Sequence, residues 1–291
     1  MIRETAVPDA TTRFERTRPL TRRRLAIGHT ARVVTPRIAI VRRPGPRLAE
    51  GLVTHIDRTP IDLALAQSQW EQYVEVFRKR GWRIVEVPAA DDCPDAVFVE
   101  DTAVVAGDMA VVCRPGAPER APEVVAVRDV LSAVGLDVVH LPEGHLDGGD
   151  VLKVADTVYI GVGGRTDTEG ASAFGELVST RGFRAVQVPT TKVLHLKSAV
   201  TALPDGTIIG YPPDVDSIDV FDRFLAVPEP DGAHVVVLDE HLVLLAASAP
   251  DTADLLRSRG LDVVTVDIGE FIRLEGCVTC LSIRVRGGDP L

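Results

Sequence analysis

The chain has 291 residues, of which 45% are hydrophobic, so it is long enough and apolar enough to bury a sizeable core. Its formal net charge is -10 and its pI is about 5.2. This acidity argues against a phosphate-binding protein and favours a cationic small molecule as the ligand. The sequence also lacks a run of the ~18 apolar residues that a membrane span needs.

Residues 1 to about 35 are rich in arginine and include "TRRRLAIGHT", whereas the acidic excess lies further along the chain. We expect this segment to be a flexible extension, with an anion-contacting arm as the alternative. The remaining residues, 36–291, are expected to form one domain. The four cysteines are scattered (Cys93, Cys113, Cys277 and Cys280), and no secretory signal precedes them. This pattern predicts a protein of the reducing cytoplasm.

A short phrase recurs along the rest of the chain: "GWRIVEVP" (81–88), "GLDVVHLP" (135–142), "GFRAVQVP" (182–189) and "GLDVVTVD" (260–267). Each phrase has the pattern of a strand that follows a glycine. An apolar-periodic stretch precedes each one, at 70–80, 127–134, 174–181 and 252–259. Glycine directly after such a stretch is the usual end of a helix, so the sequence predicts a repeated helix and strand.

Further strand-like runs joined by tight turns follow these phrases. The first spans 96–116, where Gly107-Asp108 is expected to make a hairpin, and similar runs follow at 146–164, 194–213 and 224–248, the last preceded by a degenerate helix. The final run, "CVTCLSIRVR" (277–286), has only one strand, and "RIAIVRRPG" (37–45) is its expected partner. Five such units with a strand shared across the termini predict a closed propeller, because closure removes exposed sheet edges.

Equivalent positions in such a ring should face one axis, so polar residues at one repeat position should meet there. In the first strand of each unit we expect the following polar residues: Glu100 and Asp101, Asp147 and Asp150, His195, His234, and Cys280. A carboxylate, an imidazole and a thiol would therefore converge, although they lie up to 180 residues apart in the sequence.

Each of these residues also has an ordinary structural explanation. Glu100 and Asp101 could be an exposed pair at a strand end, "LDGGD" could be a turn, and a lone histidine is often only hydrogen-bonded. The CxxC spacing of Cys277 and Cys280 lies in a β-rich run, which disfavours a redox motif or a zinc site. A spacing of three puts the two cysteines on opposite faces of a regular strand, and the pattern does not decide which one faces the cleft.

The motifs "RRPGPRLAEGLVTH", "DCPDAVFVEDTAVV", "LDGGDVLKVADTVYIG", "KVLHLKSAVTALPDGT" and "EGCVTCLSIRV" occur in one order between residues 37 and 286. In these motifs the chain resembles the bacterial dimethylarginine dimethylaminohydrolases of the guanidine-modifying pentein superfamily. The resemblance implies an α/β fold, a five-bladed propeller of ββαβ repeats with the site on its central axis. It also implies hydrolysis of Nω-methylated arginines to citrulline and dimethylamine or methylamine.

The resemblance assigns roles to individual residues. Cys280 is the implied nucleophile, His195 the general acid and base, and Asp147 their acidic partner. Residues implied to bind substrate are Asp95, Glu100 and Asp101 at the guanidinium, Arg120 and Arg165 at the carboxylate, and Leu52 and Leu274 at the amino-acid end and the site wall. Ala121 and Asp167 depart from the family pattern, and Asp167 would add negative charge near the substrate carboxylate.

The resemblance implies no cofactor, no metal, and a small-molecule partner rather than nucleic acid or membrane, and it leaves a homodimer open. A ring of carboxylates should raise the pKa of the Cys280 thiol until a cationic substrate arrives. The alternatives are an arginine or agmatine deiminase of the same superfamily and, in another class, a non-catalytic propeller that binds a basic ligand. Agmatine has no carboxylate, so an agmatine enzyme would not need Arg120 and Arg165.

Overall fold

Five three-stranded sheets make up the part of the chain that the computed structural model describes, which is residues 37–286 together with Met1. The expected N-terminal extension, apart from Met1, lies outside these residues. In each sheet the middle strand pairs antiparallel with one neighbour and parallel with the other. The sheets are the blades of an α/β-propeller, as the sequence predicted.

Three blades have the full ββαβ order within a continuous stretch of chain. The first of these contains β3 (Ala103–Ala106), β4 (Met109–Val112), α2 (Val124–Ala133) and β5 (Asp137–His140). The next contains β6 (Val151–Val154), β7 (Thr157–Gly163), α3 (Thr168–Ser179) and β8 (Arg184–Thr190). The third contains β12 (Val235–Val237), β13 (Leu242–Ala246), α5 (Pro250–Ser258) and β14 (Asp262–Val266).

The blade of β9 (Val200–Ala202), β10 (Ile208–Gly210) and β11 (Phe224–Ala226) has only a short 3-10 turn, η5 (Pro212–Asp214), where the others have a helix. The degenerate helix expected before 224–248 is therefore confirmed. Two short helices, α4 (Leu196–Ala199) and α6 (Gly269–Ile272), lie outside the repeat. Further 3-10 turns are η1 (Leu48–Glu50), η2 (Val99–Thr102), η3 (Pro118–Glu123), η4 (Gly148–Asp150) and η6 (Pro230–Ala233).

The last blade joins the two ends of the described chain. Its strands are β15 (Ile283–Val285), β1 (Ile38–Val41) and β2 (Arg83–Glu86), with α1 (Leu63–Lys79) between β1 and β2. Ile38 pairs with Val285 and Ile40 with Ile283 in the antiparallel ladder. The predicted pairing of the final strand with 37–45 is therefore confirmed. This pairing completes the fifth blade, so the strands at both ends of the described chain have partners and the ring of blades closes.

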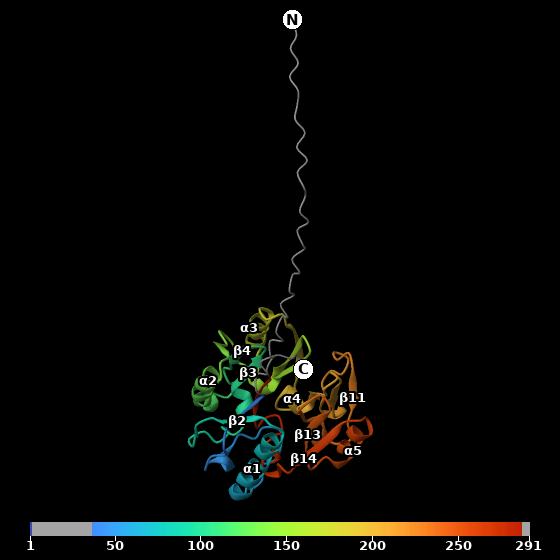
Figure 1. The fold of residues 1–291 in the computed structure, drawn as a ribbon. Coiled ribbons are helices and arrows are strands. Elements are labelled where there is room, and N and C mark those ends of the chain that lie inside the picture. Colours follow the sequence, from blue (N-terminus) through green and yellow to red (C-terminus); the bar gives the residue numbers. More distant parts are fainter. Residues whose placement is uncertain (2–36, 287–291) are drawn as a thin grey trace, which may run out of the picture. The chain divides into compact units, whose positions relative to one another are not determined.

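The helices cover the outer side of the blades, and Figure 1 shows α1, α2, α3 and α5 at the periphery of the strands. Asp62 caps the N-terminus of helix α1, because its side chain accepts a hydrogen bond from the Leu65 amide, and the helix ends before Gly81, which has a φ of 75°. Its buried face includes Trp70, Tyr73 and Phe77, spaced three and four residues apart.

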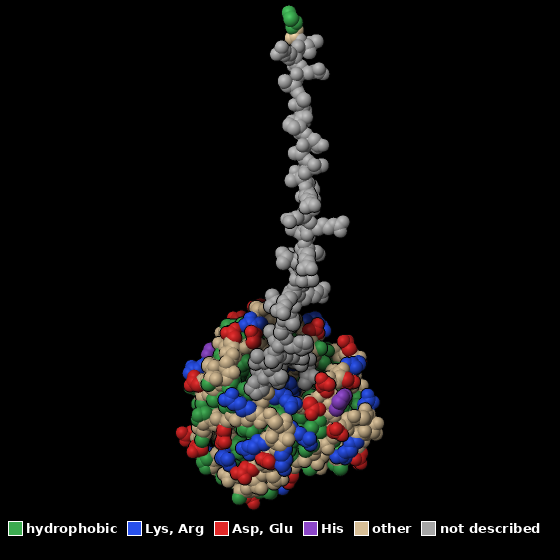
Figure 2. Space-filling view, in the orientation of Figure 1, with side chains coloured by type: hydrophobic (Ala, Val, Ile, Leu, Met, Phe, Trp, Pro, Cys, Tyr) green, Lys and Arg blue, Asp and Glu red, His purple; other side chains and the backbone are tan. Residues whose placement is uncertain are grey.

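First strands of neighbouring blades contact one another on the inner side, as β15 contacts β3 and β9 contacts both β6 and β12. Side chains of several kinds are interspersed on the surface face shown in Figure 2, with acidic and basic groups mixed among apolar ones.

Truncating Ile40 tests the importance of the closing blade, since Ile40 is fully buried between β15 and β2. We expect Ile40→Ala to lower the free energy of unfolding by about 2–5 kcal/mol, because it leaves a cavity in the core. The matched variant Ile56→Ala removes the same atoms from a side chain that is 46% exposed, and it should cost less than about 0.5 kcal/mol. Urea unfolding measures both values. Equal losses in the two variants would contradict a stabilising role for this blade.

Candidate functional site

The polar residues of the repeat lie on short turns just before the first strands, not in the strands as the sequence analysis expected. Glu100 and Asp101 lie in η2, Asp147 directly precedes η4, and His195 directly precedes α4. Cys280 closes a turn, because its amide donates to the carbonyl of Cys277. Three successive blades and the closing blade thus present their turns at the same end of the inner strands.

The two cysteines of the final motif lie side by side. The prediction that they occupy opposite faces of a strand is wrong, because residues 277–280 form a turn and β15 begins only at Ile283. The two Sγ atoms are 3.2 Å apart, and the Cys277 amide lies 3.4 Å from the Cys280 Sγ, to which it donates. Both side chains are buried and all four cysteines are free thiols.

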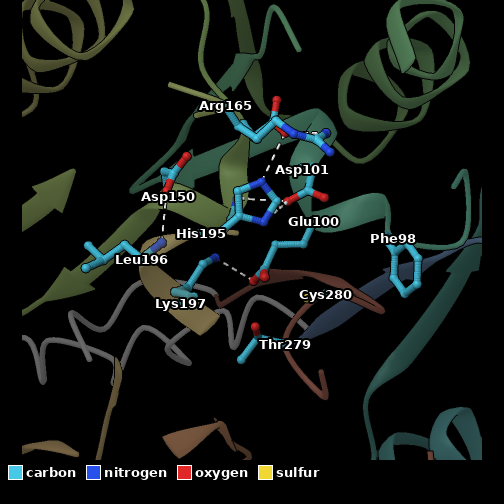
Figure 3. A network of polar contacts seen from close by, with 12 residues as sticks. Phe98, Glu100, Asp101, Asp150, Arg165, His195, Leu196, Lys197, Thr279 and Cys280 are labelled. Carbon is cyan, nitrogen blue, oxygen red and sulfur yellow. Dashed lines mark hydrogen bonds and ion pairs between the residues drawn. The ribbon is translucent and has the colours of Figure 1, made fainter. Parts of the chain in front are cut away.

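His195 lies between two buried carboxylates. Its Nε2 is 3.1 Å from Asp147 Oδ2, and its Nδ1 is 3.8 Å from Asp101 Oδ1. Figure 3 shows the imidazole with Asp101 on one side and Arg165 above it. Burial lowers the pKa of His195, but the charge of Asp101 and the hydrogen bond to Asp147 outweigh burial and raise this pKa to about 9. The ring is therefore protonated at neutral pH.

Asp147 is held in place by its other contacts. Its Oδ1 accepts from the Gly116 amide at 2.9 Å, and its Oδ2 lies 3.9 Å from Arg165 Nη1. Burial opposes ionisation, but the hydrogen bond with His195 lowers the pKa of Asp147 below its ordinary value. Asp147 and His195 therefore form an ion pair whose orientation is fixed by the backbone.

Asp101, Asp147 and His195 each offer an atom within 4.8 Å of the others, which by distance alone could hold a metal ion. A protonated imidazole has no free lone pair for a metal. Because the pKa of His195 is raised to about 9, the arrangement favours a proton-transfer network at neutral pH.

A small cavity of about 20 Å³ lies beside His195 and Cys280. Its wall contains eight of the ten residues that the family resemblance assigned to the site. These are Leu52, Asp95, Asp101, Arg120, Arg165, His195, Leu274 and Cys280. Phe98, Leu194, Glu275 and Gly276, which the sequence analysis did not single out, complete the wall. The structure therefore brings together residues from opposite ends of the chain around one space.

Glu100 and Asp147 are the two assigned residues that do not line this cavity. The Glu100 carboxylate binds Lys197 Nζ at 2.6 Å and an Arg284 nitrogen at 2.5 Å, both through Oε1. Figure 3 shows the Lys197 amine directed at this carboxylate. Burial opposes ionisation of Glu100, but the charges of Lys197 and Arg284 lower its pKa. In this state Glu100 pairs with protein cations, and its Oε2 finds no hydrogen-bond partner among the described residues.

The two arginines of the wall differ in how fully they are engaged. Arg120 is almost fully buried, and its guanidinium binds Asp101 at 2.5 Å and Glu123 at 2.8 Å and also donates to two backbone carbonyls. Arg165 has only the longer contact with Asp147 and donates no side-chain hydrogen bond to the described residues. Arg165 is therefore the freer of the two to bind a ligand anion.

The segment after Gly51 closes the cavity and is tied down at two points. The Leu52 amide donates to both oxygens of Asp95, at 3.2 and 3.0 Å. Glu275 accepts from the Thr54 amide at 2.8 Å and also from the His55 amide. Glu275 has a φ of 60°, an unusual backbone conformation for a residue with a side chain. Sequence patterns gave no signal for this contact, because it joins residues 220 positions apart.

Asp150 holds the turn that carries His195. Its Oδ1 accepts from the Leu196 amide at 2.8 Å, and its Oδ2 accepts from Thr166 Oγ1 at 2.6 Å. Burial raises the pKa of Asp150 to about 6. The residue therefore acts on the site through the position of His195.

The two departures from the family pattern lie away from the cavity wall. Asp167 is the N-cap of α3, where its Oδ1 accepts from the Gly170 amide at 2.7 Å and its Oδ2 lies 3.1 Å from His145 Nδ1. Ala121 is exposed. The helix terminus and His145 thus engage the charge that the sequence analysis placed near a substrate carboxylate.

No helix among the described residues is long and apolar enough to cross a membrane. No family model matches the chain. A curated N(G),N(G)-dimethylarginine dimethylaminohydrolase of Streptomyces coelicolor is 55% identical over 249 residues, which cover 85% of this chain and 96% of that protein. A curated protein of the same name from Pseudomonas aeruginosa is 29% identical over 251 residues, covering 84% and 98% of the two chains.

Solved structures give the same relationship. A mutant of the Pseudomonas aeruginosa enzyme, complexed with citrulline, superimposes with a TM-score of 0.79 at 27% identity, covering 85% of this chain and 98% of that chain. Identity of 55% across nearly the whole Streptomyces protein establishes that this chain belongs to the dimethylarginine dimethylaminohydrolase family.

Proposed function

We propose that the protein hydrolyses Nω-methylated arginines, releasing dimethylamine or methylamine and leaving citrulline. The observation that carries this proposal is the meeting of a thiol, an imidazolium and buried carboxylates at one cavity whose wall also contains two arginines. Carboxylates suit a guanidinium and arginines suit a carboxylate, so the cavity fits an amino acid with a cationic tail. The Streptomyces relative bears the name of this activity.

In this proposal Cys280 attacks the central guanidinium carbon and Asp101 holds the planar cation by charge-assisted hydrogen bonds. His195, held by Asp147, donates its proton to the departing amine as the C–N bond breaks. This leaves a covalent thiouronium on Cys280. Neutral His195 then takes a proton from water, whose oxygen attacks the same carbon, and the C–S bond breaks to give the ureido product and the free thiol.

The surroundings of Cys280 disfavour ionisation of its thiol before substrate binds. The hydrogen bond with Cys277, burial, and the negative charges of Glu100 and Asp101 raise the pKa of Cys280 well above its ordinary value. A cationic guanidinium beside Asp101 would offset that charge. We therefore assign thiolate formation to the complex with substrate rather than to the empty enzyme. Because His195 is already protonated, the thiol proton passes to solvent in this proposal.

Substrate entry requires the cavity to enlarge. A volume of about 20 Å³ is far below the roughly 300 Å³ at which small-molecule pockets begin. The segment with Leu52 and Thr54 is joined to the wall chiefly by hydrogen bonds to Asp95 and Glu275. We propose that these contacts break as substrate enters. We assign to Arg165 the role of binding the substrate carboxylate. Arg120 would join it when Asp101 exchanges its ion pair with Arg120 for one with the substrate guanidinium.

The cytoplasm is the proposed location, and the four free thiols are compatible with a reducing compartment. We also propose that the protein forms a homodimer. Light scattering of the purified protein measures the mass of the assembly directly.

The substrate is tested by incubating the protein with asymmetric dimethylarginine, monomethylarginine, arginine and agmatine and measuring the ureido product and released amine. We expect turnover of the two methylated arginines and little of agmatine, which lacks a carboxylate for Arg165. Faster turnover of unmethylated arginine would favour the deiminase alternative, and no turnover of any of the four would favour the binding propeller.

The nucleophile is tested by Cys280→Ala, with Cys93→Ala as the matched control because Cys93 is also a buried free thiol but lies outside the cavity wall. We expect Cys280→Ala to lower kcat by about a thousandfold or more. The control should keep most of the activity. Substantial turnover by Cys280→Ala would contradict the covalent mechanism.

The His195 ion pair should appear in the pH dependence of stability. Because the pKa of His195 rises from an ordinary 6.5 to about 9 on folding, its protonation stabilises the fold fully below pH 6.5. This contribution, about 3 kcal/mol, disappears as the pH rises through 9.

We therefore expect the stability difference between the wild type and His195→Gln to shrink as the pH rises from 6.5 to above 9. Urea unfolding at several pH values measures the two free energies, and comparing the variants removes the contribution of other titrating groups. A difference that stays constant over this range would show that His195 is not protonated between the carboxylates.

A further inference from the structure

A second and larger cavity, of about 320 Å³, extends along the inner strands from Lys197 and Thr279 to the hairpin turns at their other end. Its wall contains residues of β6, β9 and β12 and the hairpin turns that follow β6 and β9, including Ala155 and the segment 203–206. The turns that carry Asp147 and His195 precede those same strands. Because the chain enters each strand at the Cys280 end and leaves it at the hairpin end, the hairpin side of this cavity lies at the opposite end of the axis from the catalytic cavity, and the two cavities share no wall residue.

Cationic side chains dominate this second wall. They are Lys153, Lys197, Arg223, Arg284 and Arg286. Asp205 is the carboxylate in the wall, where it lies 3.6 Å from Arg223, and Glu100 adjoins the wall through its ion pairs with Lys197 and Arg284. Among the described residues, five cations against two carboxylates leave three positive charges in excess when Lys153 is protonated, and two when it is neutral. This local excess is opposite in sign to the net charge of -10 of the whole chain, so the acidity that argues against phosphate binding by the chain as a whole does not apply to this cavity.

Lys153 and Arg286 carry the part of this charge that no described carboxylate neutralises. The Lys153 ammonium donates to the Val105 carbonyl, and Arg286 Nη2 donates to the Val237 carbonyl at 2.6 Å. The Arg286 guanidinium also lies over the Trp82 ring at 5.7 Å, but its buried Nε has no hydrogen-bond acceptor among the described residues. Burying a charge without a counter-ion is costly, so the cavity is suited to receive an anion.

The pKa of Lys153 is lowered in part by the same excess of positive charge. Burial lowers its pKa to about 7, and the neighbouring charges of Arg286, Lys197 and Arg284 act in the same direction. An anion in the cavity would reverse the effect of these neighbours.

We propose that this cavity is a binding site for a small phosphorylated compound, separate from the catalytic cavity. A phosphate carries more than one negative charge at neutral pH and can accept hydrogen bonds from several lysine and arginine side chains at once. The cavity is large enough for an organic group beside the phosphate, and Val151, Leu203 and Val235 provide apolar surface for it.

Two of the cations connect this site with the catalytic turns. Lys197 lies two residues after His195, and Arg284 donates to the Thr279 carbonyl at 2.9 Å, next to Cys280. Both cations also hold Glu100 Oε1. A phosphate that draws Lys197 and Arg284 toward itself loosens their hold on Glu100, so its binding should alter turnover as well as stability.

Titration calorimetry of the full chain with inorganic pyrophosphate tests the site, with sodium chloride at equal ionic strength as the reference for general salt effects. We expect saturable binding by the wild type and binding at least tenfold weaker in Lys153→Gln and in Arg286→Gln. The matched variant Arg128→Gln removes a positive charge from the exposed face of α2, and it should bind like the wild type.

Cys280→Ala is the second control, and it should bind pyrophosphate like the wild type even if the enzyme acts on a different substrate from the one proposed above. The site is refuted if pyrophosphate has no more effect than chloride. It is also refuted if Arg128→Gln weakens binding as much as Arg286→Gln does.

A measurement on the unaltered protein covers the case in which the cavity variants fail to fold. At pH 8 a limiting amount of an amine-acylating reagent should modify Lys153, whose low pKa leaves it mostly neutral, and peptide mass spectrometry reports the extent. Pyrophosphate should protect Lys153 several-fold while leaving exposed Lys79 in α1 unaffected. Equal modification of Lys153 with and without pyrophosphate would overturn the proposal.

Discussion

The antiparallel pairing of β15 with β1 is the constraint on which the rest of the structure depends. Ile283 and Ile40 are paired residues although they are more than 240 positions apart in sequence. This pairing fixes the turn just before β15, which carries Cys280. Helix α1 contributes directly, because the Tyr73 hydroxyl donates to the Val278 carbonyl at 2.8 Å and lies 2.7 Å from Ser282 Oγ. The nucleophile from the end of the chain is thus positioned by elements from its beginning.

Much of the fold could be predicted from the sequence because each repeat has recognisable local patterns of apolar residues, glycines and turns. Glycine after an apolar-periodic helix marks four of the five outer strands, and Gly107 marks a hairpin through its positive φ. Closure of the ring could be predicted because the final run, 277–286, contains only one strand, which needs a partner, and residues 37–45 offer one. These features depend on residues close together in sequence, so periodicity and turn chemistry were sufficient to identify them.

The details of the site depended on contacts that no local pattern records. The CxxC spacing was read as a strand, yet residues 277–280 form a turn that brings both sulfur atoms within 3.2 Å. Family motifs placed Glu100 on the substrate, but its ion pairs with Lys197 and Arg284 arise only when three blades meet. Lys197 and Arg284 both lie within motifs of the family resemblance, "KVLHLKSAVTALPDGT" and "EGCVTCLSIRV", but neither motif indicates that the two cations pair with Glu100. Which buried cation neutralises which carboxylate is a property of the closed ring.

Charge along the axis is separated into two regions, of which one favours cations and the other favours anions. Around His195 the buried carboxylates of Asp101 and Asp147 favour positive charge, whereas around Lys153 and Arg286 the excess is positive. Glu100 lies between them, with one oxygen bound to two cations and the other without a partner. Electrostatic interactions in a low-dielectric interior extend over several ångströms. A change of charge at either end must therefore act on Glu100, which makes this carboxylate the physical link between the nucleophile and the basic cavity behind it.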